Sequence, residues 1–278
     1  RVPVVKCAQA MGPFRSRVNR LAARAILPRM RLIVSRGRIT HGHVEALGIR
    51  PLQRGADLAF TLEHAPHRAE ATPNEGLVGC APSVVMHKKI DAAGGDYVAE
   101  MAQFITYLVE SGRQVVLLPH SARAHTSASH NNDLPLCRSI HAALAPHVRT
   151  ATRFSNMELS ARELRTVIAG CDVFVTSRFH AMVSGLATGT PTLVLGWSHK
   201  YVEVLEMFGA EDFAIAHGDY SQECLRSRFT SLWQNREAMA ARLREALPGV
   251  RAVAEQQLDA IAQVLGAGAA RPQRTDGV

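Results

Sequence analysis

Two stretches of the chain, QVVLLP at 114–119 and DVFVTS at 172–177, are almost continuous runs of apolar residues. Strands of this kind belong in sheets covered on both faces, because a strand with one face in water alternates apolar and polar residues. Short apolar runs alternate with amphipathic segments along the rest of the chain. Alternating strands and helices form parallel sheets with right-handed crossovers, so the sequence predicts an α/β fold.

The alternation predicts where the elements lie. We expect strands at residues 3–8, 31–35, 57–60, 76–81, 114–118, 172–176, 192–196 and 212–216. We expect helices at residues 15–27, 39–47, 95–111, 133–145, 160–169, 179–187 and 200–208, and long terminal helices within 221–265.

The segment TLEHAPHRAEATPNEG at 61–76 is polar, contains proline and shows no periodicity, which predicts a linker between two α/β halves. The half before it holds fewer strands than a Rossmann-like domain normally has, so we expect that an N-terminal piece is missing. The predicted organisation is a partial N-terminal Rossmann-like domain at 1–62, a linker at 63–76, a C-terminal Rossmann-like domain with terminal helices at 77–266, and a disordered tail at 267–278.

The net charge and the excess of arginine over lysine indicate which classes of ligand the protein can bind. The chain of 278 residues has a formal net charge of +8, and only four of its 32 basic residues are lysines. Arginine is suited to bidentate contacts with carboxylate or phosphate groups. Because the arginines are dispersed and only 5% of the residues are aromatic, we expect no nucleic-acid partner.

Several features that the sequence lacks lead to expectations about the cellular compartment and about metals and cofactors. No apolar run reaches the roughly 18 residues of a membrane span and no signal peptide is visible, so we expect a cytoplasmic protein. The five cysteines are widely spaced without a CxxC pair, which indicates free thiols in a reducing compartment. His41 and His43 lie two apart on a helical pattern and do not share a face. We therefore expect neither a metal site nor a cofactor.

Polar and basic residues follow most of the predicted strands. Ligands of open parallel sheets bind beyond the carboxyl ends of the strands, so these residues are candidates for a site. Two facing α/β halves would gather them in one positively charged cleft, whose ligand should be anionic. The candidates are Arg36, Ser83, His120, Asp133, Ser177, Arg178, His180 and Lys200.

Arg178 and His180 are the strongest pair, because they stand where a buried strand meets a helix. The guanidinium of Arg178 offers a planar fork of donors for a carboxylate or phosphate, and the helix N-terminus adds partial positive charge. Histidine side chains can titrate near neutrality, so His180 is a candidate proton donor. The alternative interpretation is structural: Arg178 forms a salt bridge and His180 caps the helix.

The other candidates also have two interpretations. His120 and Asp133 flank a long polar loop that is either a substrate loop or a solvated surface loop. Asp133, with Asn132, is equally suited to cap the following helix. Arg36 is either an anion contact or a helix-entry residue, and Lys200 is either a phosphate contact or a solvated lysine.

Several blocks of the sequence resemble one known family. The stretch CDVFVTSRFHAMVSGLATGTPTLVLGWSHKYVEVLEMFG, together with QAMGPF, SRGRITHGHVEALGI, ADLAF and the VVLLPHSARAH…NNDLPLC block, resembles the polysaccharide pyruvyl transferase family in order and spacing. The resemblance covers roughly residues 5 to 210. It implies a GT-B-like fold of two Rossmann-like domains with the active site between them.

The resemblance also implies a reaction and roles for residues. A pyruvyl group moves from phosphoenolpyruvate to a sugar or glycan acceptor, usually as a cyclic ketal, with release of phosphate. The family's R-x-H motif belongs to the donor site and corresponds here to Arg178 and His180. Arg178 is expected to clamp the donor and His180 to act as general acid. From their places near predicted strand ends and loops, and not from the resemblance, Arg36, His120 and Lys200 are expected as further anion contacts, and Ser83, Asp133 and Ser177 complete the predicted substrate site.

The chain departs from the family pattern at its start. Family members usually begin with a glycine-rich GG-x-N-x-GD-like segment, which this sequence lacks, so the N-terminal domain is expected to be incomplete. Two alternatives stay open: a GT-B glycosyltransferase that uses a nucleotide-sugar donor, and a non-catalytic relative. The acceptor sugar, the catalytic base and the oligomeric state do not follow from the sequence.

Overall fold

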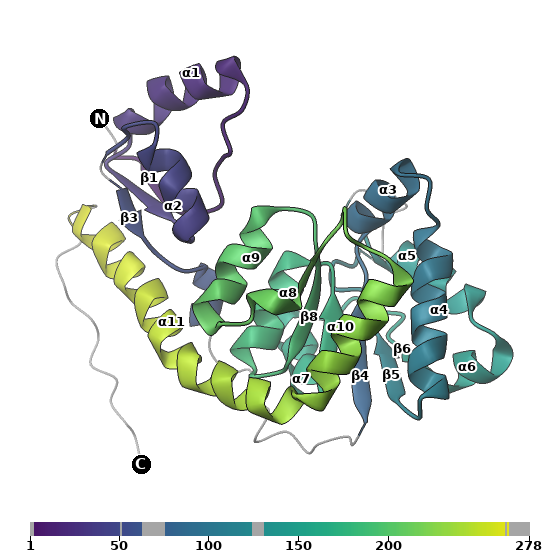
Figure 1. Cartoon of the computed structure of the whole chain (residues 1–278). Coiled ribbons are helices and arrows are strands. Elements are labelled where there is room, and N and C mark those ends of the chain that lie inside the picture. Colours follow the sequence, from purple (N-terminus) through teal and green to yellow (C-terminus); the bar gives the residue numbers. More distant parts are fainter. Residues whose placement is uncertain (1–2, 51, 63–75, 124–130, 265, 267–278) are drawn as a thin grey trace, which may run out of the picture. The chain divides into compact units, whose positions relative to one another are not determined.

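The computed structural model describes residues 3–50, 52–62, 76–123, 131–264 and 266. Most of the predicted linker and the predicted tail lie outside these residues. The chain divides into two compact units, Arg1–Thr61 with Gly249–Val278 and Leu62–Pro248 (Figure 1). Each unit contains a parallel sheet, which confirms the predicted α/β class.

The first unit is built on a parallel sheet whose described strands run in the order β1-β2-β3. Its elements are β1 (Val5–Gln9), α1 (Arg17–Ile26), the 3-10 helix η1 (Leu27–Arg29), β2 (Leu32–Ser35), α2 (Arg38–Glu45), β3 (Leu52–Arg54) and the 3-10 helix η2 (Leu58–Thr61). Ile33 of β2 packs on the α1 and α2 side, whereas its neighbours Leu32 and Val34 face the other way.

The strand predicted at 57–60 is wrong. These residues form η2, and the third strand is β3, a few residues earlier. Asp57 is the reason, because its carboxylate accepts a hydrogen bond from the amide of Ala59 at 2.9 Å and its carbonyl accepts one from the amide of Phe60. An aspartate that bonds its own backbone two residues on starts a turn.

The long helix α11 (Arg236–Val264) contributes to both units. From Gly249 onward it belongs to the first unit, where the side chain of Gln257 accepts a hydrogen bond from the Ala8 amide at 2.6 Å and donates to the Ala56 carbonyl at 3.1 Å. The sequence-based division placed all of 77–266 in one domain. No periodicity marks this change of partner, because the helix continues through it.

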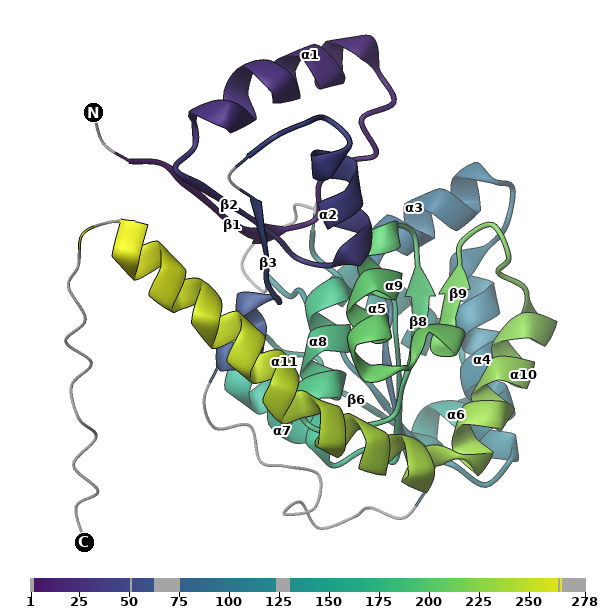
Figure 2. The same ribbon diagram turned by 60° about the vertical axis from the view of Figure 1, so that its left-hand side comes forward.

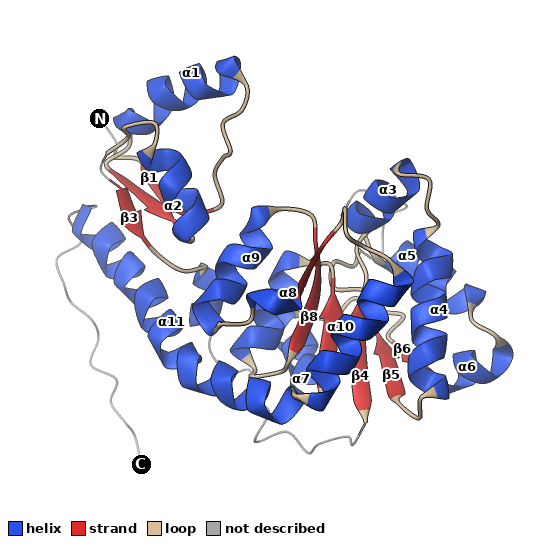
Figure 3. Cartoon of the chain, in the orientation of Figure 1, coloured by secondary structure: helices blue, strands red, loops and turns tan. Residues whose placement is uncertain are grey.

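The second unit contains a larger sheet, whose described strands are all parallel in the order β6-β5-β4-β7-β8-β9 (Figure 3). The strands are β4 (Leu77–Ala81), β5 (Gln114–Leu117), β6 (Thr152–Phe154), β7 (Val173–Thr176), β8 (Thr192–Gly196) and β9 (Ala214–Ala216). The sequence analysis missed β6, which has only three residues and an exposed arginine at its centre.

Helices cover both faces of this sheet (Figure 2). One layer contains α3 (Val84–Ala92), α4 (Tyr97–Glu110), α5 (Leu134–Ala143), α6 (Pro146–Ala151) and α10 (Gln222–Gln234), and the other contains α7 (Ala161–Ala169), α8 (Phe179–Ala187) and α9 (His199–Leu205). Two short 3-10 helices, η3 (Glu206–Phe208) and η4 (Glu211–Phe213), precede β9. None of the described helices combines the length and apolar character that a membrane crossing requires.

The strand order reverses between β4 and β7, the first strands of the two halves of this sheet. Beyond the carboxyl ends of two such strands the connections diverge to opposite faces and leave a crevice, where ligands of this fold class bind. Ala81 pairs with Thr176 at this end of the sheet. Ser83 and Arg178 follow them, so the fold brings two predicted site segments to one place.

Helix α8 packs very close to the sheet because of Gly185. A Cβ built there would overlap the Thr192 hydroxyl and contact the Phe174 ring. We expect Gly185→Ala to lower the free energy of unfolding by about 1–3 kcal/mol through overpacking. The control is Gly42→Ala in α2, where nothing lies within 4 Å of the built Cβ. Urea unfolding of both variants tests this, and equal stabilities would refute the close packing.

Candidate active site

The carboxylate of Asp133 organises the crevice. Its side chain is fully buried, at 0% exposure. It accepts hydrogen bonds from the amides of Val84 at 3.0 Å and Ser121 at 3.1 Å, and from the guanidinium of Arg178. Asp133 therefore joins the segments that follow β4, β5 and β7. It precedes α5 but makes no side-chain cap there, and Asn132 accepts from the Leu134 amide instead.

Arg178 forms a two-pronged pair with this carboxylate. Nε donates to Oδ2 of Asp133 at 2.7 Å and Nη2 donates to Oδ1 at 2.6 Å. Such bidentate pairs fix the plane of the guanidinium. Nη1 has no hydrogen-bond partner among the described residues, and the side chain keeps 16% exposure. The predicted salt bridge is thus present, and one edge of the cation is still available to a ligand.

His120 lies among cations at the end of β5. Burial is the largest cause that lowers the pKa of this imidazole, followed by the positive charges of His180, Arg178 and Arg165, and together they bring it to about 3. His120 is therefore neutral at pH 7. We call this neutral imidazole and the basic residues around it, Arg165, Arg178 and His180, the cationic cluster. His180 is its exposed member, at the start of α8 with its ring edge-to-face against Phe179.

The depressed pKa of His120 predicts a pH dependence of stability. The unfolded chain, with a histidine pKa near 6.5, binds the proton first as the pH falls. The contribution of His120 to the free energy of unfolding is therefore fully present above pH 6.5 and is lost as the pH falls toward 3. About 2 kcal/mol of it is lost by pH 5. A His120→Gln variant should lose correspondingly less stability over this range. Parallel unfolding curves for the two proteins at pH 7 and pH 5 would contradict the burial of this imidazole.

The structure places Ser83 and Ser177 beneath the site. Ser83 is buried and caps α3, where its hydroxyl accepts from the Val85 amide at 3.1 Å. The Ser177 hydroxyl pairs with the Tyr97 hydroxyl at 3.0 Å, and its carbonyl accepts from the hydroxyl of Tyr201. Burial raises the pKa of Tyr97 above its ordinary value. These contacts stabilise the segments that follow β4 and β7. Contact of Ser83 or Ser177 with substrate remains a prediction.

Two further predicted residues make other contacts. Arg36 belongs to the first unit, where it forms a buried ion pair with Asp57 at 2.9 Å. Lys200 is the second residue of α9 in the second unit, and its ammonium nitrogen lies 4.0 Å from the centroid of the Trp197 ring and 5.2 Å from that of Phe179. Cation–π contacts of this kind hold the lysine head against an aromatic surface. Their roles as anion contacts are likewise still predictions.

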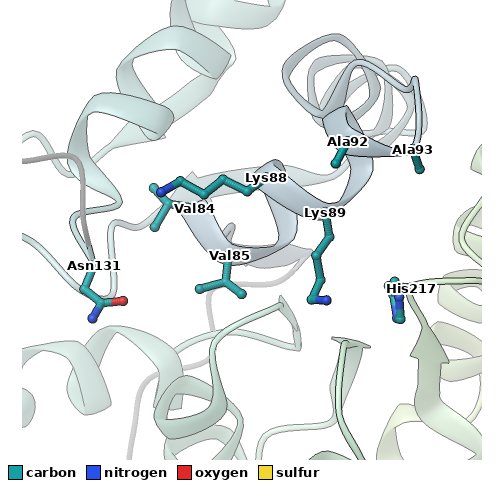
Figure 4. A pocket seen from close by; sticks show the side chains of 8 residues that line it. All are labelled: Val84, Val85, Lys88, Lys89, Ala92, Ala93, Asn131 and His217. Atoms are coloured by element: carbon teal, nitrogen blue, oxygen red, sulfur yellow. The ribbon is translucent and has the colours of Figure 1, made fainter.

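Two features of the site were not predicted from the sequence. One is Arg165, which is buried inside α7 and donates to the Leu62 carbonyl at 3.3 Å. The other is a pocket of about 500 Å³ beside α3, with Lys88, Lys89 and His217 in its wall (Figure 4). A signal for the pocket existed, because Lys88 and Lys89 are the only adjacent lysines in a lysine-poor chain. Among the described residues, no three His, Cys, Asp or Glu side chains gather as metal ligands.

The fold and the site together define a class of protein, a GT-B-like α/β protein with a cationic cluster at the switch point of its second sheet. A family model for polysaccharide pyruvyl transferases matches residues 1–199. The chain belongs to the polysaccharide pyruvyl transferase family, which is a family of enzymes. This confirms the resemblance found in the sequence.

Comparisons with individual proteins agree with this assignment. The amylovoran biosynthesis protein AmsJ of Erwinia amylovora is 23% identical over 227 residues, which are 76% of this chain and 53% of that protein. The chain thus spans about half the length of this curated relative.

Solved structures show the same architecture. An α,α-trehalose-phosphate synthase (UDP-forming) from Burkholderia vietnamiensis aligns with a TM-score of 0.57 and 12% identity, over 94% of this chain and 67% of that one. HepE of Anabaena, solved in complex with UDP-glucose, aligns with a TM-score of 0.57 and 13% identity, over 94% and 72%. At these identities the likeness shows the GT-B-like fold alone.

Proposed function

We propose that the cationic cluster of the second unit is a phosphoenolpyruvate site and that the protein transfers the pyruvyl group to a sugar or glycan acceptor. The observation that carries this proposal is Arg178, held bidentately by a buried carboxylate with Nη1 still available, among His120, Arg165 and His180. Phosphoenolpyruvate is a compact anion with a carboxylate and a phosphate. Guanidinium and imidazole donors at a switch-point crevice suit both groups.

Asp133 supports the proposal by pre-orienting the arginine. A guanidinium fixed in one plane loses little conformational entropy when it binds an anion, so more of its interaction appears as affinity. Asp133 offsets the charge of one guanidinium, and the cations that remain in the cluster still favour an anionic ligand. We assign Arg178 the donor carboxylate or phosphate.

The reaction that follows uses His180 as general acid. A proton from its imidazolium adds to the methylene carbon of phosphoenolpyruvate and leaves an electrophilic carbon at the ester position. One sugar hydroxyl attacks this carbon, the C–O bond to phosphate breaks, and a second hydroxyl closes the cyclic ketal. Of the two hydroxyl protons released, one replaces the proton on His180 and one leaves with inorganic phosphate. The exposure of His180 at the helix start gives it access to such a donor.

The proposal also covers the acceptor and the cellular location of the reaction. AmsJ is an amylovoran biosynthesis protein, and a glycan acceptor for this chain is consistent with that relative. We place the reaction in the cytoplasm, as the sequence predicts. The nucleotide-sugar alternative draws support from the fold shared with HepE, whose structure contains UDP-glucose.

Ligand-dependent unfolding separates these two donors. Phosphoenolpyruvate at about a hundred times its dissociation constant should raise the free energy of unfolding by roughly 2.7 kcal/mol. The same titration with UDP-glucose should leave the thermal midpoint unchanged. Stabilisation by UDP-glucose alone would replace the pyruvyl-transfer proposal with a glycosyltransferase.

A further inference from the structure

The pocket beside α3 lies at the same edge of the second sheet as the cationic cluster but has its own set of side chains. Val84 and Val85, at the start of α3, contribute apolar wall, and the polar groups are Lys88, Lys89, Asn131 and His217. Figure 4 shows the two lysines extending from α3, with Asn131 and His217 on opposite sides of the helix. Its volume of about 500 Å³ is within the usual range for small-ligand sites.

The chemistry of this wall selects an anion. It presents two ammonium groups, an imidazole and an amide, and none of the described lining residues is acidic. Lysine ammonium groups bind phosphate as compact point charges. An anionic ligand also offsets the repulsion between neighbouring cations. A neutral sugar alone would leave this charge uncompensated.

The pocket acts through side chains rather than through the N-terminus of α3. The first helical amides are already used inside the protein, since Val84 donates to Asp133 at 3.0 Å and Val85 donates to Ser83 at 3.1 Å. Asp133 also accepts from Arg178. The Asp133 carboxylate thus contacts both Arg178 and the backbone of a pocket residue, Val84, so the pocket and the cationic cluster are neighbours that use different cations.

The fluorescence of Trp197 can report on binding in the pocket, because its ring lies near Lys89. The ammonium of Lys89 lies 6.0 Å from the centroid of the Trp197 ring. An anion that draws Lys89 into the pocket changes this contact and so changes the fluorescence of the indole. The other tryptophan, Trp233, packs against Arg113 and Phe229 and can be replaced by phenylalanine.

We propose that this pocket is a second anion site, which binds a phosphate-ester group of a ligand other than the donor. Its assignment to the acceptor, as a glycan that carries a phosphate group, rests on the proposed function. The anion site itself does not, because it follows from the pocket and its lysines.

The test is a fluorescence titration of the full chain with inorganic pyrophosphate, in a Trp233→Phe background. We expect a saturable change that a Lys88→Ala/Lys89→Ala double variant weakens by about tenfold or more in affinity. A Lys6→Ala/Arg29→Ala double variant, which removes the same charge from the first unit, should bind like the parent. A His180→Gln variant should also bind pyrophosphate within about twofold of the parent.

Two results would overturn the proposal. One is unchanged pyrophosphate affinity after loss of both pocket lysines. The other is competition by phosphoenolpyruvate, which would mean that the pocket holds the donor's own phosphate. If pyrophosphate binds through the lysines while phosphoenolpyruvate binds nowhere, the second anion site stands and the proposed function fails.

Discussion

Replacement of Asp133 by alanine is expected to lower the free energy of unfolding of the second unit by about 3–5 kcal/mol and to abolish binding of phosphoenolpyruvate. The substitution leaves a largely buried guanidinium without its partner, and breaking one side of a buried pair costs this much. It also removes the acceptor of two backbone amides, Val84 and Ser121. The loops after β4, β5 and β7 then lose their common anchor.

The matched control is Glu45→Ala, which breaks the exposed ion pair between Glu45 and Arg50 at 3.0 Å. Such surface pairs contribute about 0–1 kcal/mol. Urea unfolding of both variants measures the difference. If Asp133→Ala is no less stable than Glu45→Ala, Asp133 does not organise the site.

His180→Gln is expected to reduce pyruvyl transfer by about 100-fold or more while leaving the protein folded. General acid catalysis by a positioned histidine contributes about 10²–10⁴-fold. The side chain is exposed, so its loss should change the free energy of unfolding by less than about 0.5 kcal/mol. The measurement is release of phosphate from phosphoenolpyruvate, together with the mass of the pyruvylated acceptor.

The control for this variant is His147→Gln on α6, an exposed histidine outside the cationic cluster. Its turnover should equal that of the parent. A second comparison separates binding from chemistry, because His180→Gln should reduce kcat more than it weakens binding of phosphoenolpyruvate. Turnover near that of the parent in His180→Gln would remove this residue from the reaction.

The main elements of both sheets were predictable because they depend on local pattern. Helix α8 lies at the predicted residues 179–187, and β7 falls within the predicted strand. Helix α3 was missed because Val84, Val85 and Met86 are consecutive and do not repeat at helical spacing. The cap at Ser83, which follows a proline, was the available signal.

The site was predictable only where it depends on strand ends. That rule found Arg178, His180 and His120, because each follows a buried strand. It did not find the pairing of Arg178 with Asp133, since 45 residues separate them and no local pattern connects them. Arg165 was missed for a related reason, because a charged residue in the middle of a helix normally faces water.

The most direct test of the donor site is NMR titration of the His120 imidazole in the full chain, with and without phosphoenolpyruvate. Without ligand, we expect the His120 imidazole to have a pKa of about 3, set by burial and by the surrounding cations. A bound anion offsets the charges of Arg178, Arg165 and His180, so phosphoenolpyruvate should raise this pKa, whereas UDP-glucose should leave it unchanged. If saturating phosphoenolpyruvate leaves the His120 resonance and its pKa unchanged, the donor does not bind at the cationic cluster.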